Sequence, residues 1–315
     1  NFVRLGILMF HSILYIHLFQ PDFTGFTINL SVKYKLMKIN LAKSAGFCFG
    51  VKRAIDVAMK SAASGRNIFM LGDIVHNETV VSQISKAGIK KISRLSNGSG
   101  KTLLIRAHGA PLSTLNKAVN AGYRIIDATC PMVKEIHKIA KDMESRGFTI
   151  IVIGDRNHDE VRGIVGQLRG KAIVVDDIRN IPKRTFKKAC VVVQSTQNIQ
   201  KVIKIIETLR PHAKELKFFN TICKPTTMRQ DEARRLPLDN DLMIIIGSRH
   251  SANTKRLYEI SKSLNTRSYW VGSKNDIKKS WFKGIKSVGV TAGASTPEST
   301  TQNIVNYLKT LKITL

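Results

Sequence analysis

Short apolar runs alternate with amphipathic segments along the chain from Met37 onward. Three of the runs, NIFML, TIIVI and DLMIII, have the length of buried strands, and each follows a segment with helical spacing, VKRAIDVAMK, MVKEIHKIAKDM or TTMRQDEARRL. Regular alternation of strands and helices is typical of parallel sheets. The pattern therefore predicts an α/β fold.

The same pattern occurs three times. A cysteine stands before each helical segment and a glycine ends the strand 24 residues later, in the pairs Cys48 and Gly72, Cys130 and Gly154, and Cys223 and Gly247. This repeat predicts three pseudo-symmetric α/β subdomains in a trefoil-like arrangement around a central cavity. We expect subdomains at residues 37–129, 130–222 and 223–315, and an extension outside the core at residues 1–36.

Polar residues follow the strands at equivalent places. Four residues after the glycines stand His76, His158 and Ser251, and two residues further on stand Glu78, Glu160 and Asn253. A further strand in each repeat ends at His108, at Ser195 with Thr196, and at Ser295. Open α/β sheets bind ligands at the carboxyl ends of their strands, so we expect these side chains to line the central cavity with the cysteines.

Composition narrows the class of protein. With 315 residues and 43% apolar content, the chain can bury a large core. Only four cysteines occur, and three of them occupy equivalent positions, which argues against a disulfide scaffold and for ligands kept reduced in a cytoplasm. The fourth, Cys190, lies in the apolar run CVVV and is predicted to be a small buried hydrophobe.

The net charge of +29 raises the alternative of a nucleic-acid-binding protein. The basic residues are nevertheless spread along the whole chain, there is no basic low-complexity tail, and aromatic residues make up only 7%. We therefore interpret most of these charges as solvated surface and expect no nucleic-acid partner.

The first 36 residues differ from the rest. The segment LGILMFHSILYIHLF is apolar, but its roughly 15 residues are fewer than a membrane span needs. The segment MKINLAKSAGFCFGV, from Met37, reads like a natural N-terminus that enters a first strand. We expect an upstream extension and no association with a membrane.

Three cysteines from three repeats suit a buried centre on the pseudo-threefold axis. A structural zinc site usually has four protein ligands with paired short spacings, and no CxxC occurs in the chain. Thiolates select zinc, copper(I) or iron–sulfur clusters. Three thiolates on a four-iron cluster would leave one iron open, and an open iron can bind a substrate oxygen as a Lewis acid.

The polar strand ends offer many hydrogen-bond donors and few fixed negative charges, which suits a phosphate or diphosphate. Helix N-termini after these strands would add backbone donors. A carboxylate beside an anion is unfavourable unless it carries a proton, so Glu160 is a candidate proton donor. Glu78 is left without a role in the site and is a possible cap of the following helix.

Nine ordered motifs resemble one known family. They are AGFCFGVKRAI, HNETVV, RAHGAP, DATCPMVKEIH, HDEVRGIVGQ, QSTQN, TICKPTTMRQDEA, GSRHSANTKRL and GVTAGASTPES. Over about residues 37–313 they are similar to the 4-hydroxy-3-methylbut-2-enyl diphosphate reductases, the LytB-type last enzymes of the methylerythritol phosphate isoprenoid pathway.

The resemblance implies one [4Fe–4S] cluster per chain, held by Cys48, Cys130 and Cys223, whose fourth iron receives the substrate hydroxyl. It implies that two electrons and two protons remove this hydroxyl as water, which gives isopentenyl and dimethylallyl diphosphate, and that Glu160 supplies a proton. Contacts to the diphosphate, or support for them, are implied for His76, His108, His158, Ser195, Ser251, Ala252, Asn253 and Ser295.

Besides Ser195, which stands where threonine is usual, three positions depart from the family pattern. Ala252 stands where a second serine is common, Asp159 replaces a usual proline before Glu160, and Arg162 occupies a position that is more often acidic. At Ala252 the backbone or a water would have to replace one side-chain contact. None of the three changes removes a cysteine or the candidate proton donor.

Two alternatives from other classes stay open at this point. One is a basic RNA-binding protein with structural cysteines, and the other is a zinc-dependent module that uses the same three thiolates. For the reductase, the chain has no nucleotide-binding glycine fingerprint, so we expect the electrons to come from a separate ferredoxin or flavodoxin. We expect the enzyme in the cytoplasm.

Overall fold

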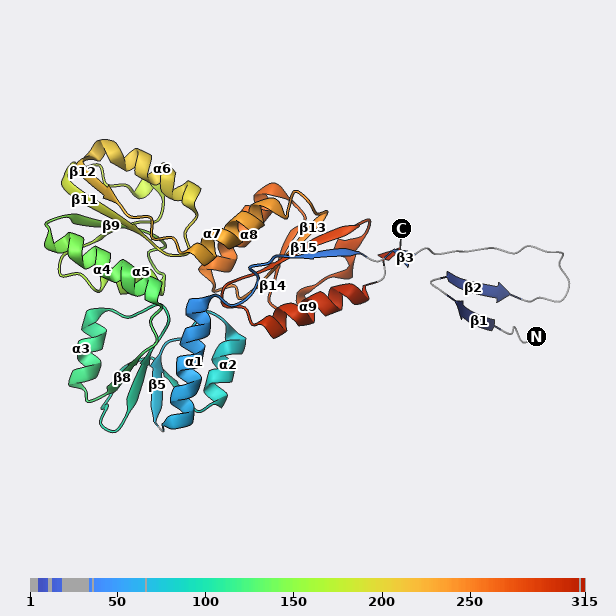
Figure 1. The fold of residues 1–315 in the computed structure, drawn as a ribbon, viewed down its shortest axis with the longest axis horizontal. Coiled ribbons are helices and arrows are strands. Elements are labelled where there is room, and N and C mark those ends of the chain that lie inside the picture. The colour runs from blue at the N-terminus through green and yellow to red at the C-terminus, as the bar shows by residue number, and fades with distance from the viewer. Residues whose placement is uncertain are drawn as a thin grey trace.

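The computed structural model describes residues 5–10, 13–18, 34–35, 37–65, 67–311 and 313–314. Within this part of the chain, three lobes meet at a common centre, and each lobe is built on a parallel sheet of four strands (Figure 1). Two helices cover one face of each sheet and one helix covers the other face. The predicted α/β fold with three subdomains is confirmed.

The first lobe has the strand order β6-β5-β7-β8. Apolar residues of α1 and α2, such as Ala54 and Val80, pack with Met70 on one face of the sheet, and Ala118 of α3 packs on the other face. The elements are α1 (Phe49–Ser64), β5 (Ile68–Leu71), α2 (Glu78–Lys86), β6 (Lys90–Ile92), β7 (Thr102–Ile105), α3 (Leu112–Asn120) and β8 (Arg124–Asp127).

The second lobe repeats this topology with the order β10-β9-β11-β12. Its central strand β11 is buried on both faces from Ala189 to Val193, as expected for a covered parallel sheet, and Cys190 is buried there as predicted. The elements are α4 (Pro131–Ser145), β9 (Thr149–Ile153), α5 (Asp159–Val165), β10 (Ile173–Val175), β11 (Phe186–Val193), α6 (Ile199–Leu209) and β12 (Ala213–Phe218), with short 3₁₀ turns at Ile178–Asn180 and Arg210–His212.

The third lobe has the order β14-β13-β15-β4. Its fourth strand, β4, comes from the start of the core, although it occupies the place that β8 and β12 occupy in the other lobes. This sheet thus joins the two ends of the core. The subdomain boundaries expected from the sequence stay a prediction. The elements are β4 (Lys38–Leu41), α7 (Lys224–Arg235), β13 (Leu242–Ile246), α8 (Ala252–Leu264), β14 (Ser268–Val271), β15 (Ser287–Ala292) and α9 (Glu298–Thr310), with 3₁₀ turns at Lys274–Asp276 and Lys279–Phe282.

Beyond the three lobes, β1 (Leu5–Phe10) pairs with β2 (Ile13–Leu18), and β3 (Tyr34–Lys35) pairs with β16 (Ile313–Thr314), both in antiparallel fashion. The other residues of the predicted extension, 1–36, lie outside the described residues. No helix in the described ranges combines the length and the apolar character needed to cross a bilayer.

The sheet topology places the three cysteines at equivalent points. Strands β4, β8 and β12 each lead into a cysteine that precedes the first helix of a lobe. The amide of each cysteine donates a hydrogen bond to the carbonyl just past the neighbouring third strand, namely Cys48 to Ala294 at 3.1 Å, Cys130 to Ala107 at 3.0 Å and Cys223 to Ser195 at 3.1 Å. The predicted repeat is therefore a repeat of backbone contacts as well as of sequence.

Candidate active site

The three cysteines are the N-cap residues of α1, α4 and α7. Pro131 and Pro225 stand in the first turns of α4 and α7, where a missing N–H costs nothing. A helix N-terminus carries partial positive charge and stabilises an anion, including a thiolate. Each thiol thus lies at the positive end of its own helix.

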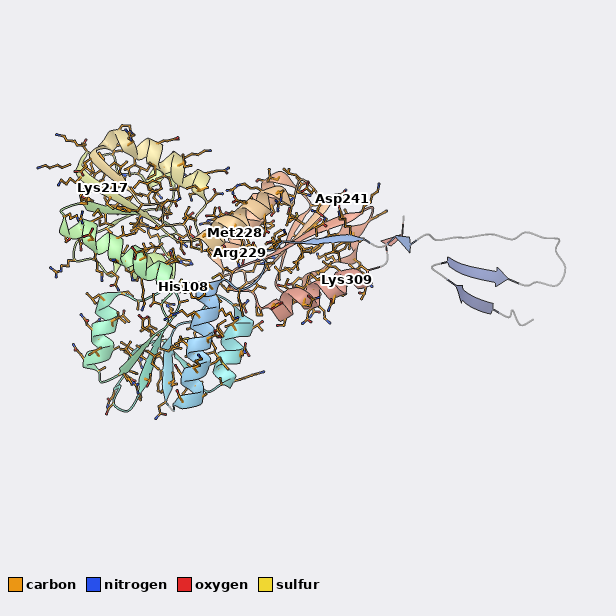
Figure 2. The ribbon with its side chains drawn as sticks, viewed as in Figure 1. His108, Lys217, Met228, Arg229, Asp241 and Lys309 are labelled. Carbon is orange, nitrogen blue, oxygen red and sulfur yellow. The ribbon has the colours of Figure 1, made fainter. Side chains whose placement is uncertain are left out.

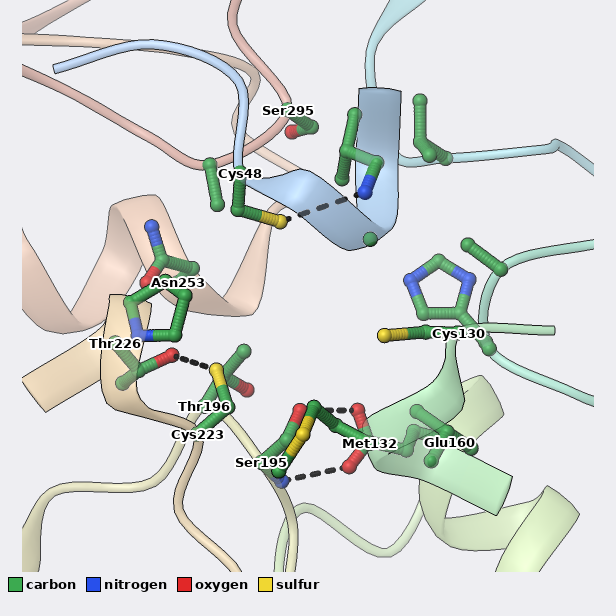
Figure 3. Close-up of a pocket in the computed structure, with 18 of the residues that line it drawn as sticks. Cys48, Cys130, Met132, Glu160, Ser195, Thr196, Cys223, Thr226, Asn253 and Ser295 are labelled. Atoms are coloured by element: carbon green, nitrogen blue, oxygen red, sulfur yellow. Dashed lines mark hydrogen bonds between the residues drawn. The ribbon is translucent and has the colours of Figure 1, made fainter. Parts of the chain in front are cut away.

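All three cysteines line one cavity of about 170 Å³ where the lobes meet (Figure 3). The cavity brings together every residue that the sequence nominated for the site. Besides the cysteines, its walls include His76, His108, His158, Glu160, Ser195, Thr196, Ser251, Ala252, Asn253 and Ser295.

The thiols differ in their surroundings. Burial raises the pKa of Cys130 and Cys223, although backbone N–H groups at Cys130 and a hydrogen bond from Thr226 at Cys223 offset part of the rise. The sulfur of Cys223 lies 3.1 Å from the Thr226 hydroxyl, and the sulfur of Cys48 accepts the amide of Val51 at 3.4 Å. Partly buried thiolates of this kind need positive charge nearby, which a bound metal centre supplies.

Gly50 allows the first and second cysteine segments to approach. A Cβ atom at this position would lie 2.5 Å from the sulfur of Cys130, closer than real Cβ contacts come. Gly50 is helical and has no left-handed backbone, so the close approach accounts for the glycine. The space that its missing side chain leaves is filled by a cysteine of another lobe.

Glu160 is 2% exposed and lies in the first turn of α5. Its carboxyl accepts the amide of Ser195 at 2.6 Å and the hydroxyl of Ser195 at 2.8 Å. Burial raises the pKa of Glu160, and the two hydrogen bonds from Ser195 offset part of the rise. A carboxyl in this environment can keep its proton at a pH above the usual pKa range of glutamate. Glu160 shares the cavity with the three cysteines (Figure 3).

Three histidines form one wall. The rings of His76 and His108 stack with centroids 4.4 Å apart, and His158 stands edge-on to both. Burial is the main cause that lowers the pKa of all three, and that of His158 falls to about 4. The rings are therefore neutral at pH 7, and an anion in the cavity would favour their protonation.

The third lobe contributes the opposite polar wall. Ser251 is the N-cap of α8 and accepts the amide of Thr254, so the wall lies at a helix N-terminus. Asn253 is 4% exposed, and neither atom of its side-chain amide has a partner. Buried amides without partners are rare, which points to a ligand in the cavity. Ser295 donates to the carbonyl of His76 at 3.2 Å.

The donor sets distinguish two kinds of metal site. Among the described residues, the group of three side chains close enough to share one ion is His76, His108 and His158, whose nitrogens lie within 4.8 Å of one another. The three thiols do not form such a group. The three sulfur atoms come from three lobes and are too far apart to share one ion. This arrangement fits a centre with several metal atoms better than one zinc ion.

Asp159, expected from the resemblance to stand where a proline is usual, has a defined place. Its carboxylate lies 2.6 Å from the guanidinium of Arg106 and 3.7 Å from Nε2 of His76. The substitution therefore adds a charged link between the first and second lobes beside the histidine wall. Arg162, the other charge departure, is exposed and reaches Asn157 at 3.4 Å.

Glu78 does not cap its helix, because Asn77 is the N-cap of α2 and accepts the amide of Val80. The carboxylate of Glu78 instead accepts the hydroxyl of Ser248 at 2.8 Å, across the boundary between the first and third lobes.

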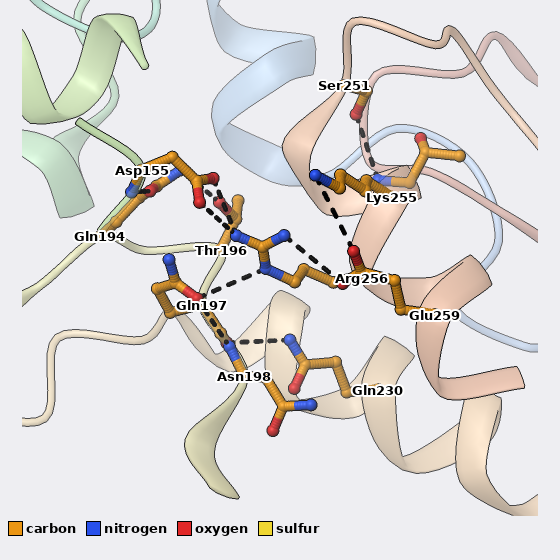
Figure 4. Close-up of polar contacts among 11 residues, drawn as sticks. Asp155, Gln194, Thr196, Gln197, Asn198, Gln230, Ser251, Lys255, Arg256 and Glu259 are labelled. Atoms are coloured by element: carbon orange, nitrogen blue, oxygen red, sulfur yellow. Dashed lines mark hydrogen bonds and ion pairs between the residues drawn. The ribbon is translucent and has the colours of Figure 1, made fainter. Parts of the chain in front are cut away.

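The boundary between the second and third lobes depends on Arg256. This arginine, 6% exposed, makes two hydrogen bonds to the carboxylate of Asp155, at 2.6 and 2.8 Å, and a longer one to Gln197 (Figure 4). The amide of Gln230 donates to the Gln197 carbonyl beside it. Both bonds to Asp155 come from one guanidinium nitrogen, Nη2, which lies between the two carboxylate oxygens.

The sequence analysis did not identify four residues that contact the cysteines or connect the segments around the site. Their place beside a cysteine or a nominated polar residue is visible in the sequence, but their contacts run between segments far apart in the chain. They are Gly50, Arg106, Thr226 and Arg229.

Comparison with known proteins agrees with this geometry. The family model described as LytB protein matches residues 39–309. A 4-hydroxy-3-methylbut-2-enyl diphosphate reductase of Geotalea daltonii is 38% identical over 278 residues, which cover 87% of this chain and 98% of that protein. The reductase of Geobacter sulfurreducens is 40% identical over 276 residues, with 87% and 97% covered.

Solved structures give the same result. A structure of (E)-4-hydroxy-3-methyl-but-2-enyl diphosphate reductase is 36% identical, with a TM-score of 0.64 over 87% of this chain and 99% of that one. The reductase of Plasmodium falciparum is 28% identical, with a TM-score of 0.82 over 89% and 91%. The family model, these relatives and the shared fold together place the chain in the LytB protein family.

Proposed function

We propose that the protein is a 4-hydroxy-3-methylbut-2-enyl diphosphate reductase that forms isopentenyl and dimethylallyl diphosphate. The observation that carries the proposal is the convergence of three N-cap cysteines and the buried carboxyl of Glu160, whose pKa burial raises, on one cavity. Two electrons and two protons enter, the carbon–oxygen bond of the allylic hydroxyl breaks, and water leaves.

Cys48, Cys130 and Cys223 would hold one [4Fe–4S] cluster. When bound, this group supplies electrons and an open iron for the substrate hydroxyl. The three helix N-termini favour the thiolate form of these ligands, and Gly50 leaves room for Cys130.

The polar walls would bind the diphosphate. The amide of Asn253, the hydroxyls of Ser251 and Ser295 and the N-terminus of α8 offer donors to phosphate oxygens. The imidazoles of His76, His108 and His158 are neutral when the cavity holds no anion, and a diphosphate would favour their protonation. At Ala252 the backbone amide or a water would take the place of one side-chain contact.

Glu160 would deliver the proton with which the hydroxyl leaves as water. Burial raises the pKa of this carboxyl and so favours its protonated form, and the amide and hydroxyl of Ser195 orient it. The electrons would come from a separate ferredoxin or flavodoxin in the cytoplasm. Neither a nucleic acid nor a membrane has a part in this proposal.

The test is anaerobic purification with measurement of iron, sulfide, zinc and visible absorption, on the wild type and on Cys130→Ser. We expect a brown protein that converts the substrate with an artificial reductant, and a variant that has lost both properties. A protein that binds zinc without sulfide, or that stays colourless after reconstitution and binds RNA in a salt-dependent way, would refute the reductase proposal.

A further inference from the structure

Two arginine side chains are buried in the described part of the chain, and their environments differ. Arg256 is 6% exposed and has the carboxylate of Asp155 as its counter-ion. Arg229 is 3% exposed, yet no carboxylate in the described ranges lies within 4.0 Å of its guanidinium. A buried cation without an anion is costly, so Arg229 requires an explanation.

The hydrogen bonds of Arg229 connect two cysteine segments. One terminal nitrogen donates to the carbonyl of Gly46 at 2.6 Å, two residues before Cys48, and the other donates to the carbonyl of Pro225 at 2.9 Å, two residues after Cys223. The remaining nitrogen, Nε, is buried and has no partner. One guanidinium therefore lies between the segments of the third and first cysteines, where the lobes meet (Figure 2).

Neither Glu232 nor the substrate forms an ion pair with this charge. Glu232, on the next turn of α7, accepts the amides of Lys43 and Ser44 at 2.9 and 3.0 Å and is occupied by these contacts. Arg229 does not line the cavity, although its helix neighbours Cys223 and Thr226 do. Its guanidinium thus contacts the backbone of two cysteine segments and lies outside the space for the diphosphate.

We propose that Arg229 is the counter-ion of the anionic centre that the three cysteine thiolates form with their cluster, and that its charge raises the reduction potential of this centre. This inference rests on the proposed function. A cluster gains negative charge when it is reduced, and a fixed cation beside it favours the reduced state. Burial lowers the pKa of Arg229, and the neighbouring sulfurs of Cys48 and Cys223, followed by the carboxylate of Glu232, oppose that effect.

The test uses the full chain with its cluster, under anaerobic conditions, and measures the midpoint potential by redox titration. We expect Arg229→Gln to lower the potential by the equivalent of a tenfold change in the one-electron equilibrium, about 59 mV. Arg229→Lys keeps the charge and should restore most of this shift. The matched control is Arg235→Gln, which removes the same charge from the exposed last turn of α7 and should leave the potential unchanged.

An unchanged potential in an Arg229→Gln protein with wild-type iron and sulfide content would overturn the inference. If Arg229→Gln does not retain the cluster, Arg229→Lys decides. Wild-type cluster content and potential in the lysine variant would support a role of the charge. Equal loss of the cluster in both variants would show that Arg229 acts only through its two hydrogen bonds to backbone carbonyls, and would refute the proposal. A wild type without any cluster would instead refute the proposed function.

Discussion

Ser195 donates both its amide and its hydroxyl to the single carboxyl group of Glu160, so two atoms of one residue fix both oxygens of another. Glu160 lies in the first turn of α5 and Ser195 follows the end of β11, and both line the cavity. This double contact orients the carboxyl without a charged partner. Burial is therefore the largest influence on the pKa of Glu160 and raises it.

The first prediction concerns this proton. We expect Glu160→Gln to lower turnover by about 10²–10⁴-fold, the range for loss of a general acid, while cluster absorption stays intact. Ser195→Ala should have a smaller effect, since the backbone amide of residue 195 still holds the carboxyl. Single-turnover kinetics with equal cluster content would check both variants, and full activity of Glu160→Gln would remove this residue from the mechanism.

A second prediction tests the approach of the cysteine segments. Gly50→Ala places a methyl group 2.5 Å from the sulfur of Cys130 and should reduce iron and sulfide content. Gly65→Ala, at the other end of α1, meets its nearest atom at 3.5 Å and serves as the matched control. Equal cluster content in the two variants would show that Cys130 has room to move.

A third prediction separates stability from binding at Asn253. Both side-chain polar atoms are buried without partners, so Asn253→Ala should not lower the free energy of unfolding as the loss of a hydrogen-bonded amide would. The same variant should raise KM for the diphosphate substrate. Thermal unfolding and steady-state kinetics measure the two effects, and an unchanged KM would exclude a contact between Asn253 and the substrate.

A fourth prediction concerns acid stability. Burial lowers the pKa of His137, which is 7% exposed, from 6.5 to about 4. The unfolded chain therefore binds a proton that the folded protein does not, and stability is lost as the pH falls from 6.5 towards 4. For this residue the loss is about 2 kcal/mol at pH 5. Urea denaturation should show that His137→Gln reduces the pH dependence, whereas an equal slope in both proteins would contradict the assignment.

A fifth prediction compares the loss of Asp155 with the loss of Arg256, the two partners of the ion pair in Figure 4. Asp155→Asn leaves the buried Arg256 with Glu259 at 3.5 Å as its nearest carboxylate, whereas Arg256→Gln leaves a carboxylate that is 36% exposed and can be hydrated. We expect the first change to destabilise more, by about 3 kcal/mol against about 1 kcal/mol. Chemical denaturation of both variants would check this order, and the reverse order would show that Asp155 is the more buried charge in solution.

Much of the fold could be predicted from the sequence because its signals are local and repeated. The strand at DLMIII and the helix after Cys130 follow from apolar runs and from Pro131 at the helix start. The cysteines and the polar strand ends could be placed in one cavity because parallel sheets present one edge to ligands. The roles assigned to these residues remain proposals.

The rest could not be predicted, because it depends on contacts between distant segments. Nothing near Lys38 in the sequence indicates that β4 pairs with β15, which begins at Ser287. The buried position of Arg229 follows from the arrangement of two lobes, and a polar helix such as α7 gives no periodic sign of which charge faces inward. A close approach such as that of Gly50 to Cys130 is likewise a property of the assembled lobes.

The pairing of β4 with β15 also has a consequence for biosynthesis. Strand β4 leaves the ribosome before the three lobes, but the strand that it pairs with is among the last to be made. The segment that carries Cys48 therefore cannot reach its final place before β15 and Ala294 have been made. Loading of a cluster by all three cysteines has to wait until β15 has been made, and until then β4 lacks the strand that covers its edge in the folded sheet.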